Sequence, residues 1–170
     1  MTTRAEREMA AGHWLLASAR SRPDAVDEWR EEGATLLRTG LLFGAVSTTA
    51  ALVHAAVGVA TPQECAAPLA EALDGPLFYE PDPSGSEDAY TALIPASAAL
   101  RWRLPESAAH PYRAMLLVPA PDRTSPGADP TTPWWVVPVD GPGNLCPANR
   151  VAALLALGRD AVSPTGGGAA

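Results

Sequence analysis

Lysine is absent from this chain of 170 residues: the twelve basic residues are all arginines, against nineteen Asp and Glu and a net charge of −7. The absence of lysine excludes a phosphate loop of the Gly-x-x-x-x-Gly-Lys-Ser/Thr type. The shortage of positive charge argues against a protein that binds nucleic-acid backbones, so we expect no duplex nucleic acid as a partner. Isoleucine occurs once and asparagine twice while alanine is abundant, which is typical of a high-GC bacterium.

Cysteine is scarce too, with two residues, which excludes a disulfide framework and favours the cytosol. No apolar run reaches the roughly 18–20 residues that span a bilayer, so we expect no membrane partner. The first eleven residues carry charges of both signs and do not resemble a signal peptide. We therefore expect a cytoplasmic protein, and the length and the 47% hydrophobic content suit one domain.

The motifs of common catalytic sites are also missing. His13, His54 and His110 lack the i, i+4 spacing of a helical zinc site, and the cysteines do not form a Cys-x-x-Cys pair. There is neither a Gly-x-Ser-x-Gly elbow nor a Gly-x-Gly-x-x-Gly motif. We therefore expect no catalytic residue, no metal and no cofactor. Cys146 opens a predicted helix, where the pKa of a thiol can fall, but a small residue that only caps the helix is the favoured interpretation.

Capping residues, prolines and glycines predict the helix boundaries. The clearest start is Thr61-Pro62-Gln63-Glu64, which offers a hydroxyl cap, a proline at the first position and an acid three residues after the cap. Gly12 and Gly158 are interpreted as helix stops. The expected helices lie at about 4–11, 23–32, 49–57, 61–73, 97–102 and 146–157.

Short apolar runs bounded by turn residues predict the strands. The segments 34–37 and 41–46 are either a hairpin or one strand and its approach. The remaining expected strands lie at 13–19, 77–79, 90–94, 115–118 and 134–137.

The order of these elements predicts the fold class. Helices and strands alternate in the first half and strands dominate the second, which indicates an α/β or α+β domain with a mixed β-sheet flanked by helices. Residues 1–12 are expected to be an N-terminal helical extension, 13–160 the domain, and 161–170 a flexible Gly/Ala tail. The proline-rich loop at 119–133 is long for a compact domain, so it is either functional or disordered.

Trp134 and Trp135 are adjacent on a predicted strand, where neighbouring side chains point to opposite faces of the sheet. One of them can fill the core. We expect the other to be exposed, or covered only by the proline-rich loop, and so to offer an interaction surface for a protein partner. Ordinary packing under the loop is the alternative.

Several short segments form a series along the chain: 14–19, Pro23 with Trp29, 34–46, 75–77, 117–119, and 134–138 with 141–143. This series resembles small bacterial proteins of the bifunctional DNA primase/polymerase N-terminal family, which are divergent relatives of the archaeo-eukaryotic primase fold. The resemblance covers about residues 13–158 and implies a primase/polymerase-like domain.

The resemblance also bears on activity. Active members of the family place two acids on a strand, with a His or a basic residue on a neighbouring strand, because two divalent cations must be held at the reacting oxygens. The small relatives read Gly-x-x-Phe-Asp-x-Val where this chain has Gly40 to Val46, with Gly44 at the position of the acid. The segment 84–90, which maps near the family's His, contains none. The resemblance therefore implies the fold and speaks against the activity.

A degenerate member of the family would be a non-catalytic binding or regulatory domain, acting through a protein partner or a small nucleotide-like ligand. A homo-oligomer is one form that such a domain can take. The expected ligand cleft is the pocket left by the lost metal site, lined by Phe43, Gly44, Ser86, Asp88 and Tyr90.

Two alternatives stay open. Three acids, Asp82, Glu87 and Asp88, gather in a polar loop whose spacing fits no standard calcium loop, so a solvated loop is the favoured interpretation. In the rival interpretation these acids are a relocated metal cluster, and the protein is an active nucleotidyltransferase. In the third, the protein is a structural subunit of a larger assembly.

Overall fold

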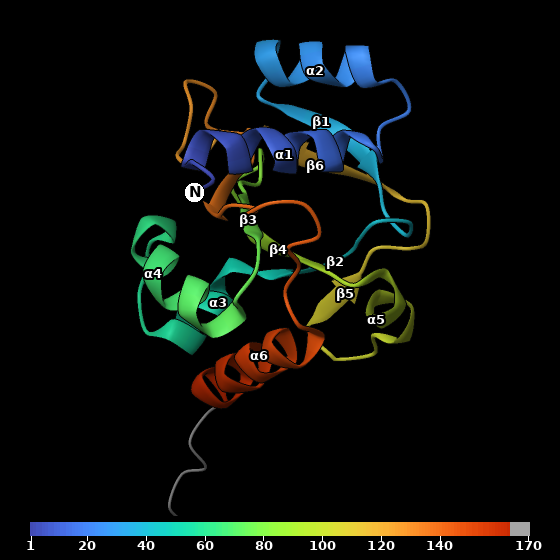
Figure 1. Cartoon of the computed structure of the whole chain (residues 1–170). Helices are drawn as coiled ribbons and strands as arrows, with labels where there is room; N and C mark the ends of the chain where they lie inside the picture. Colours follow the sequence, from blue (N-terminus) through green and yellow to red (C-terminus); the bar gives the residue numbers. More distant parts are fainter. Residues whose placement is uncertain (164–170) are drawn as a thin grey trace, which may run out of the picture.

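A computed structural model of the chain describes residues 1–163 and has the expected α+β fold of a single domain, in which a five-stranded sheet lies between two covering layers (Figure 1). The helices are α1 (Arg4–Leu16), α2 (Arg22–Glu31), α3 (Ala50–Val57), α4 (Pro62–Leu73), α5 (Ala96–Arg101) and α6 (Ala148–Val162). The strands are β1 (Ala34–Arg38), β2 (Gly44–Thr49), β3 (Leu77–Glu80), β4 (Ala89–Ile94), β5 (Ser107–Ala109), β6 (Met115–Pro119) and β7 (Trp134–Val137).

Every strand pair among the described residues is antiparallel, which corrects the expectation of a mixed sheet. The larger sheet has the order β5-β2-β4-β3-β7, and β1 pairs with β6 in a separate two-stranded ribbon, called the ribbon below. The segments 34–37 and 41–46 therefore form no hairpin, because they belong to different sheets. The short strand β5 was not predicted from the sequence, because only its pairing with β2 makes it a strand.

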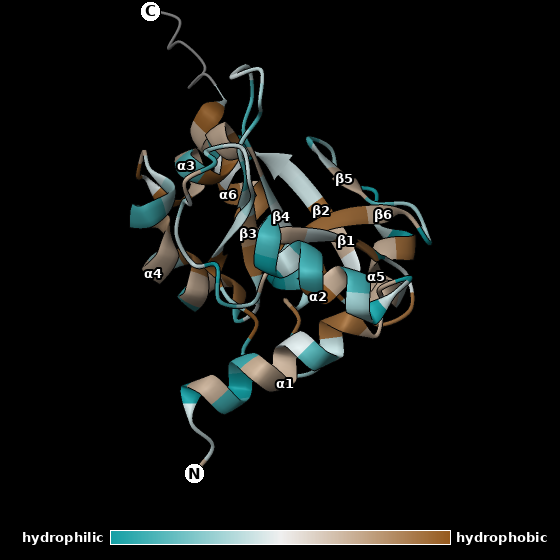
Figure 2. Cartoon of the chain, turned by 90° about the horizontal axis from the view of Figure 1, so that it is seen from above, coloured by the Kyte–Doolittle hydropathy of each residue, from teal (hydrophilic) through white to brown (hydrophobic). Residues whose placement is uncertain are grey.

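The two faces of the larger sheet bury two separate hydrophobic clusters. Side chains alternate along β2, so Val46 lies in one cluster and Ala45 in the other. Helices α3, α4 and α6 cover the face that carries Val46, called the helical face. Helix α1 and the ribbon cover the face that carries Ala45, called the ribbon face. Figure 2 views the domain from that side, with α2 in front of the strands and α1 along the lower edge of the view.

Helix α1 extends further than the sequence predicted. The segment 13–19 is not a strand: the helix continues to Leu16 and a turn follows. The run contains no β-branched residue, and Ala11 and Leu15 are four apart and fully buried, which is helical spacing. Gly12 is not a stop but a contact point, because a Cβ there would lie 3.2 Å from the Cγ of Pro121. The expected boundary at residue 12 therefore falls inside one helix.

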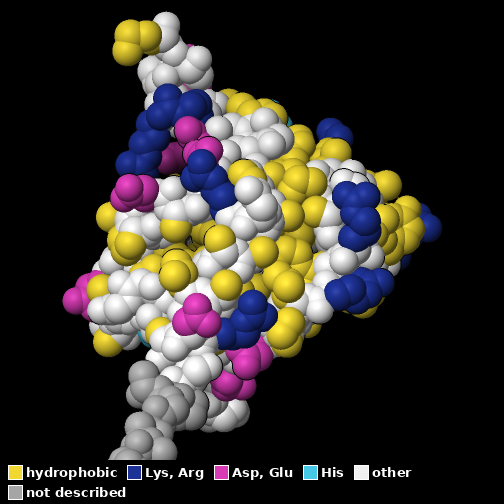
Figure 3. All heavy atoms as spheres, turned by 90° about the horizontal axis from the view of Figure 1, so that it is seen from below, with side chains coloured by type: hydrophobic (Ala, Val, Ile, Leu, Met, Phe, Trp, Pro, Cys, Tyr) yellow, Lys and Arg dark blue, Asp and Glu magenta, His cyan; other side chains and the backbone are white. Residues whose placement is uncertain are grey.

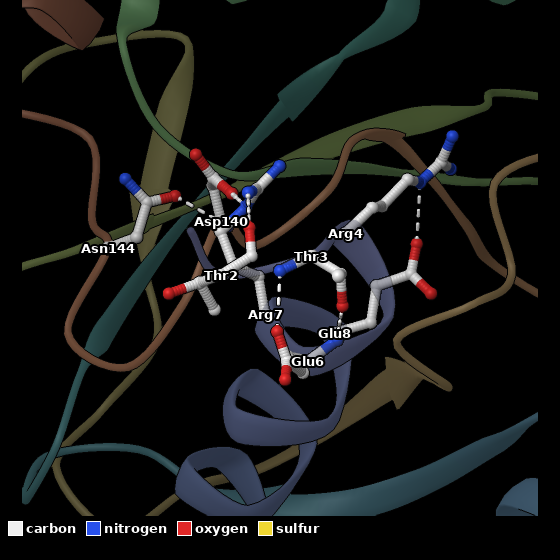
Figure 4. Close-up of polar contacts among 8 residues, drawn as sticks. All are labelled: Thr2, Thr3, Arg4, Glu6, Arg7, Glu8, Asp140 and Asn144. Atoms are coloured by element: carbon white, nitrogen blue, oxygen red, sulfur yellow. Dashed lines mark hydrogen bonds and ion pairs between the residues drawn. The ribbon is translucent and has the colours of Figure 1, made fainter.

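The start of α1 is fixed to the rest of the domain (Figure 4). Thr3 and Glu6 form a reciprocal capping box. One turn further, the guanidinium Nε of Arg7 lies 2.7 Å from a carboxylate oxygen of Asp140, and the Asp140 N–H donates to the side chain of Asn144 at 3.0 Å. The first turn is therefore tied to the loop that follows β7.

The C-terminal helix α6 also passes its expected end. Gly158 was interpreted as its stop, but the helix runs on to Val162. Gly158 is buried where α6 crosses α3, and a Cβ there would lie 2.5 Å from the carbonyl oxygen of Leu52. Residues 161–162, expected in a flexible tail, thus belong to α6, and residues 164–170 of that expectation lie outside the described residues.

The boundaries of helix α4 were predicted correctly from local sequence signals. It runs over Pro62–Leu73 with Thr61 as its N-cap, as the capping pattern predicted. It ends at Asp74, which has a left-handed backbone conformation (φ 50°).

Candidate functional site

The five residues of the expected cleft do not lie together. Phe43 is fully buried in the cluster of the ribbon face, whereas Tyr90 is fully buried in the cluster of the helical face. Gly44 pairs with Ile94, at the end of the β2–β4 pair away from Tyr90. Ser86 is exposed in the loop before β4, and Asp88 is half-buried at its base.

Gly44 leaves no room for the acid that the family would place there. A Cβ at this position would overlap the side chain of Ala99 on α5. Because α5 packs directly on β2, an aspartate at position 44 would require that helix to move away.

Two of the three acids of the predicted cluster, Asp82 and Asp88, are hydrogen-bonded within the protein, and the third, Glu87, is exposed. The Asp82 carboxylate accepts from the Oγ of Ser84 (2.7 Å) and of Ser86 (2.6 Å), and from the N–H of Ser84 and of Glu87. These bonds hold the pKa of Asp82 far below its ordinary value. Among residues 1–163, no group of three acids, histidines or cysteines is arranged to hold a metal ion.

Asp88 belongs to a second network, on the helical face. Its carboxylate accepts from the phenol of Tyr79 and, at 2.8 Å, from the N–H of Asp82. Next to it, His54 Nε2 lies 2.8 Å from the hydroxyl of Tyr90, and the Tyr79 and Tyr90 rings meet edge to face. Burial raises the pKa of both phenols. This network fixes the loop to the core.

Both tryptophans of β7 are buried, so the expectation that one is exposed is wrong. Trp134 is 4% exposed and packs against Tyr79 in the cluster of the helical face. Trp135 is fully buried against Phe78 on the ribbon face, and its indole N–H donates to the Pro119 carbonyl. The two side chains do point to opposite faces, but both faces are covered.

Cys146 is not a reactive thiol. It is buried, and its Sγ lies 3.2 Å from the Pro76 carbonyl oxygen. Burial, with a smaller contribution from the charge of Asp74, raises its pKa to about 12. The predicted helix begins at Ala148, two residues later than expected.

A row of hydrogen-bonded polar side chains crosses the ribbon face, and we call it the polar row: His110, Ser47, Thr91 and Glu80. The Oγ of Ser47 lies 2.6 Å from the Oγ1 of Thr91 and 2.7 Å from Nε2 of His110. Thr91 donates in turn to the Glu80 carboxylate. The register brings them together, because Ser47 lies opposite Thr91 and the His110 N–H donates to the carbonyl of Ala45.

Burial shifts the pKa at both ends of the polar row. It raises the pKa of Glu80, against the opposing effect of the Thr91 hydrogen bond, and lowers the pKa of His110. A serine–histidine contact of this length also occurs in nucleophile–base pairs. Among residues 1–163, however, no carboxylate hydrogen-bonds the other nitrogen of this ring, as a catalytic triad requires.

A second feature is an exposed surface that is both apolar and basic, and we call it the apolar–basic surface. Six of the ten large exposed apolar side chains in residues 1–163 lie on it: Leu36, Leu41, Leu100, Tyr112, Met115 and Leu117. Three of its arginines contact or adjoin these side chains: Arg38, Arg103 and Arg113. The fourth, Arg101, follows Leu100 at the end of α5.

Contacts between neighbouring residues make this surface continuous. On the ribbon, Leu36 lies opposite Leu117, and Arg38 lies opposite Met115. Beyond the end of the ribbon, Tyr112 packs over Gly40, whose φ of +103° and missing Cβ make room for the ring.

The surface continues from Tyr112 onto α5. Tyr112 lines a hollow of about 420 Å³ together with Leu100, Arg103 and His110. His110 therefore belongs to both the polar row and the edge of the apolar–basic surface.

The charge of this region differs from that of the whole protein. Segments 33–60 and 89–121 hold four arginines and one acid, Glu106, while the rest of the chain holds eight arginines against eighteen acids. Acids from outside these segments border the ribbon part of the surface: Asp24 and Glu28 line a hollow with Leu36 and Met115, and Glu31, Glu32 and Asp129 line one with Leu117. The ion pairs found within residues 1–163 are Arg4–Glu8, Arg7–Asp140 and Arg30–Asp27, so none uses these four arginines. In Figure 3, basic and apolar side chains lie together on the side where Figure 1 places α5.

Comparison with known proteins identified no family: no family model, no curated protein and no solved structure matches this chain. Within the described residues, no helix is long and apolar enough to cross a membrane.

The sequence prediction missed both features. Ser47 and Thr91 interrupt apolar strands with hydroxyl residues, which is a signal, but it does not identify their partners. The excess of arginines over acidic residues in the segment 89–121 is also visible in the sequence. Only the fold brings Arg38, from another segment, to the same surface.

Proposed function

We propose that this protein is a non-catalytic binding domain that acts through a protein partner, and that the partner binds the apolar–basic surface. The observation that carries the proposal is the gathering of exposed Leu, Met and Tyr side chains, with arginines at the Tyr112 end, on an otherwise acidic protein. Exposed apolar area supplies affinity, and unpaired positive charge selects the partner. The chemistry fits a partner segment in which acidic residues flank aliphatic ones.

We also propose that the domain is a degenerate relative of the primase/polymerase domains and that it works in the cytoplasm. The packing of Gly44 against Ala99 supports the loss of the acid. Both cysteines are free and buried, which is compatible with a reducing compartment.

The rival function, an active nucleotidyltransferase, requires a metal cluster. Asp82 and Asp88 are occupied by hydrogen bonds from the loop and from Tyr79, which argues against it. A titration with Mn²⁺ and a primed template tests this rival. We expect neither saturable metal binding nor nucleotide incorporation. We also expect no submicromolar binding of duplex DNA at about 150 mM salt, because the net charge is −7 and the four arginines of the apolar–basic surface are too few to neutralise a long stretch of phosphates.

A small nucleotide-like ligand is the second candidate for what this domain binds. The hollow of about 420 Å³ that Arg103 and Tyr112 line is within the usual size of ligand sites, and it offers a guanidinium beside an aromatic ring. Calorimetry with nucleoside monophosphates would detect this ligand class.

Site-specific photocrosslinking in the native host tests the partner proposal. A photoreactive amino acid replaces Leu117 on the ribbon or, as a matched control, Leu157, which is 58% exposed on α6. We expect adducts with one acidic protein from position 117 that decrease at high salt, and none from position 157. The same adducts from both positions, or none from position 117, would contradict the proposal.

The same experiment separates the remaining alternatives. An adduct between two copies of this chain would identify a homo-oligomer instead of a partner. Adducts at many positions, together with a stoichiometric complex on purification, would indicate a structural subunit of a larger assembly.

A further inference from the structure

The hydrogen bonds of the polar row have a direction, which follows from counting protons. Thr91 has one hydroxyl proton and donates it to the Glu80 carboxylate. The 2.6 Å contact between Ser47 and Thr91 therefore uses the proton of Ser47. The 2.7 Å contact between Ser47 and His110 then requires a proton on Nε2 of the ring. The row runs one way, from His110 to Glu80.

This direction assigns the tautomer of His110. A neutral imidazole carries one proton, so a protonated Nε2 leaves Nδ1 with a free lone pair. Within residues 1–163, Nδ1 has no hydrogen-bond partner, and it is not among the buried atoms that lack one, so it is open to solvent. Solvent can therefore add a proton to Nδ1 without breaking any bond of the row.

The opposite end of the row can reverse this direction. A protonated Glu80 would donate to Thr91 instead of accepting from it. Thr91 could then donate to Ser47, and Ser47 to Nε2 of His110, which would become an acceptor. Burial raises the pKa of Glu80 and lowers the pKa of His110. The two pKa values therefore lie closer together than those of an ordinary glutamate and an ordinary histidine.

We propose that Glu80 controls the position of the proton on His110 through Thr91 and Ser47, and that His110 is thereby the pH-sensitive group of the apolar–basic surface. The second half of this proposal rests on the proposed function, because it assigns a role in partner binding to that surface. The first half concerns the row alone and can be tested without any partner.

The residues around His110 are such that protonation of its ring would change the charge of the apolar–basic surface. Arg103 and Tyr112 line the same hollow, and the Arg113 guanidinium lies 5.9 Å from the centre of the Tyr112 ring. On the other side β2 presents the uncharged Ser47, and the nearest acid in sequence, Glu106, precedes β5. A proton on Nδ1 would add positive charge to an already basic surface and strengthen the binding of an acidic partner at lower pH.

The ¹⁵N NMR shifts of the His110 ring test the first half, with H110Q to assign the signals. We expect the Nε2–H tautomer in the wild-type protein. In T91V the proton of Ser47 is free to bond Nε2, so the signals should shift toward the Nδ1–H tautomer. The matched control is T48V: Thr48 is on the same strand as Ser47, but its hydroxyl donates to the Glu106 carbonyl at 2.8 Å, outside the row.

Other results would overturn the proposal. An Nδ1–H tautomer in the wild type, or the same tautomer in the wild type and T91V, would mean that the row does not control the ring. S47A, at a half-buried position, provides a second variant if T91V does not fold. Loss of the Ser47 hydroxyl should also shift the ring signals of His110 away from the Nε2–H tautomer. If the tautomer responds but crosslinking at position 117 does not increase from pH 7.5 to 5.5, the row stands and its role in partner binding fails.

Discussion

The two faces of the five-stranded sheet are buried by different kinds of structure. Three helices cover the helical face, and its cluster extends from α5 across the sheet to α6. On the ribbon face, one helix and a two-stranded ribbon cover the apolar half around Leu93 and Trp135. Beyond that half, the same face carries the polar row, from His110 to Glu80.

The two faces accommodate polar groups in different ways. On the helical face, the hydroxyls of Tyr79 and Tyr90 bond to Asp88 and His54 while the two rings pack in the apolar cluster. The ribbon is too narrow to cover the whole sheet, so polar side chains that satisfy one another can occupy the rest. The outer side of the ribbon, with Leu36 and Leu117, is itself left uncovered and is our candidate for binding.

Replacing either tryptophan of β7 should produce the largest effect and test whether both faces are equally essential. Trp134→Ala opens the cluster of the helical face, and Trp135→Ala opens that of the ribbon face. Each should lower the free energy of unfolding by about 3–5 kcal/mol, measured by urea denaturation. A loss below about 1 kcal/mol for one of them would show that its face contributes little to stability.

Replacing one glycine on each side of the sheet by alanine should distinguish how tightly the two faces are packed. Gly158→Ala forces a Cβ against the Leu52 carbonyl where α6 crosses α3, and should cost about 1–3 kcal/mol by overpacking. Gly12→Ala meets only the edge of the Pro121 ring at 3.2 Å, and the gain in helix propensity of about 1 kcal/mol offsets that contact. Urea midpoints should therefore fall clearly for the first variant and little for the second; equal losses would contradict this account.

Acidification should destabilise the protein through one histidine on each side of the sheet. Burial lowers the pKa of His54 and of His110 below the ordinary value of 6.5. The unfolded chain then binds more protons, so the free energy of unfolding falls as pH drops below that value. Glu80, with a raised pKa, acts in the opposite direction nearer its ordinary value of 4.5, so the measurement is confined to pH 7.5–5.5.

Variants assign this pH dependence. H54Q and H110Q should each flatten the curve of urea midpoint against pH. An unchanged curve in both buried variants would mean that other groups cause the dependence.

The smallest effect on stability is expected on the outer side of the ribbon. Leu117→Ser should change the free energy of unfolding by about 0.5 kcal/mol or less, because Leu117 is exposed. Leu116→Ser, its buried neighbour on β6, should be severely destabilising. Under the proposed function, Leu117→Ser should nevertheless weaken partner binding, seen as fewer adducts from a photoreactive group at position 36.

Local signals predicted much of the secondary structure. Thr61 and Pro62 begin α4, and Asp74 ends it, because capping requires only residues within one turn. The same reasoning failed at Gly12 and Gly158, which have the sequence appearance of helix stops. Both glycines instead meet a distant segment at close range, which no local pattern reveals.

The expected site failed for a related reason. Phe43 and Gly44 were placed with Tyr90 because they follow a resemblance in sequence, yet strand alternation and register put them on different faces and at opposite ends of a strand pair.

The sequence by itself determined the α+β class, most helix starts, the opposite orientations of Trp134 and Trp135, and the absence of common catalytic motifs, because each depends on composition or on residues close along the chain. The tertiary structure alone decided which strands pair, that both tryptophans are buried, and that Ser47 joins His110 and Thr91. Several of these outcomes depend on residues far apart in the sequence: the two hydrogen bonds of Ser47 span 44 and 63 positions, and β1 pairs with the distant strand β6. Register and layer packing fix such contacts, and neither is encoded in any single segment.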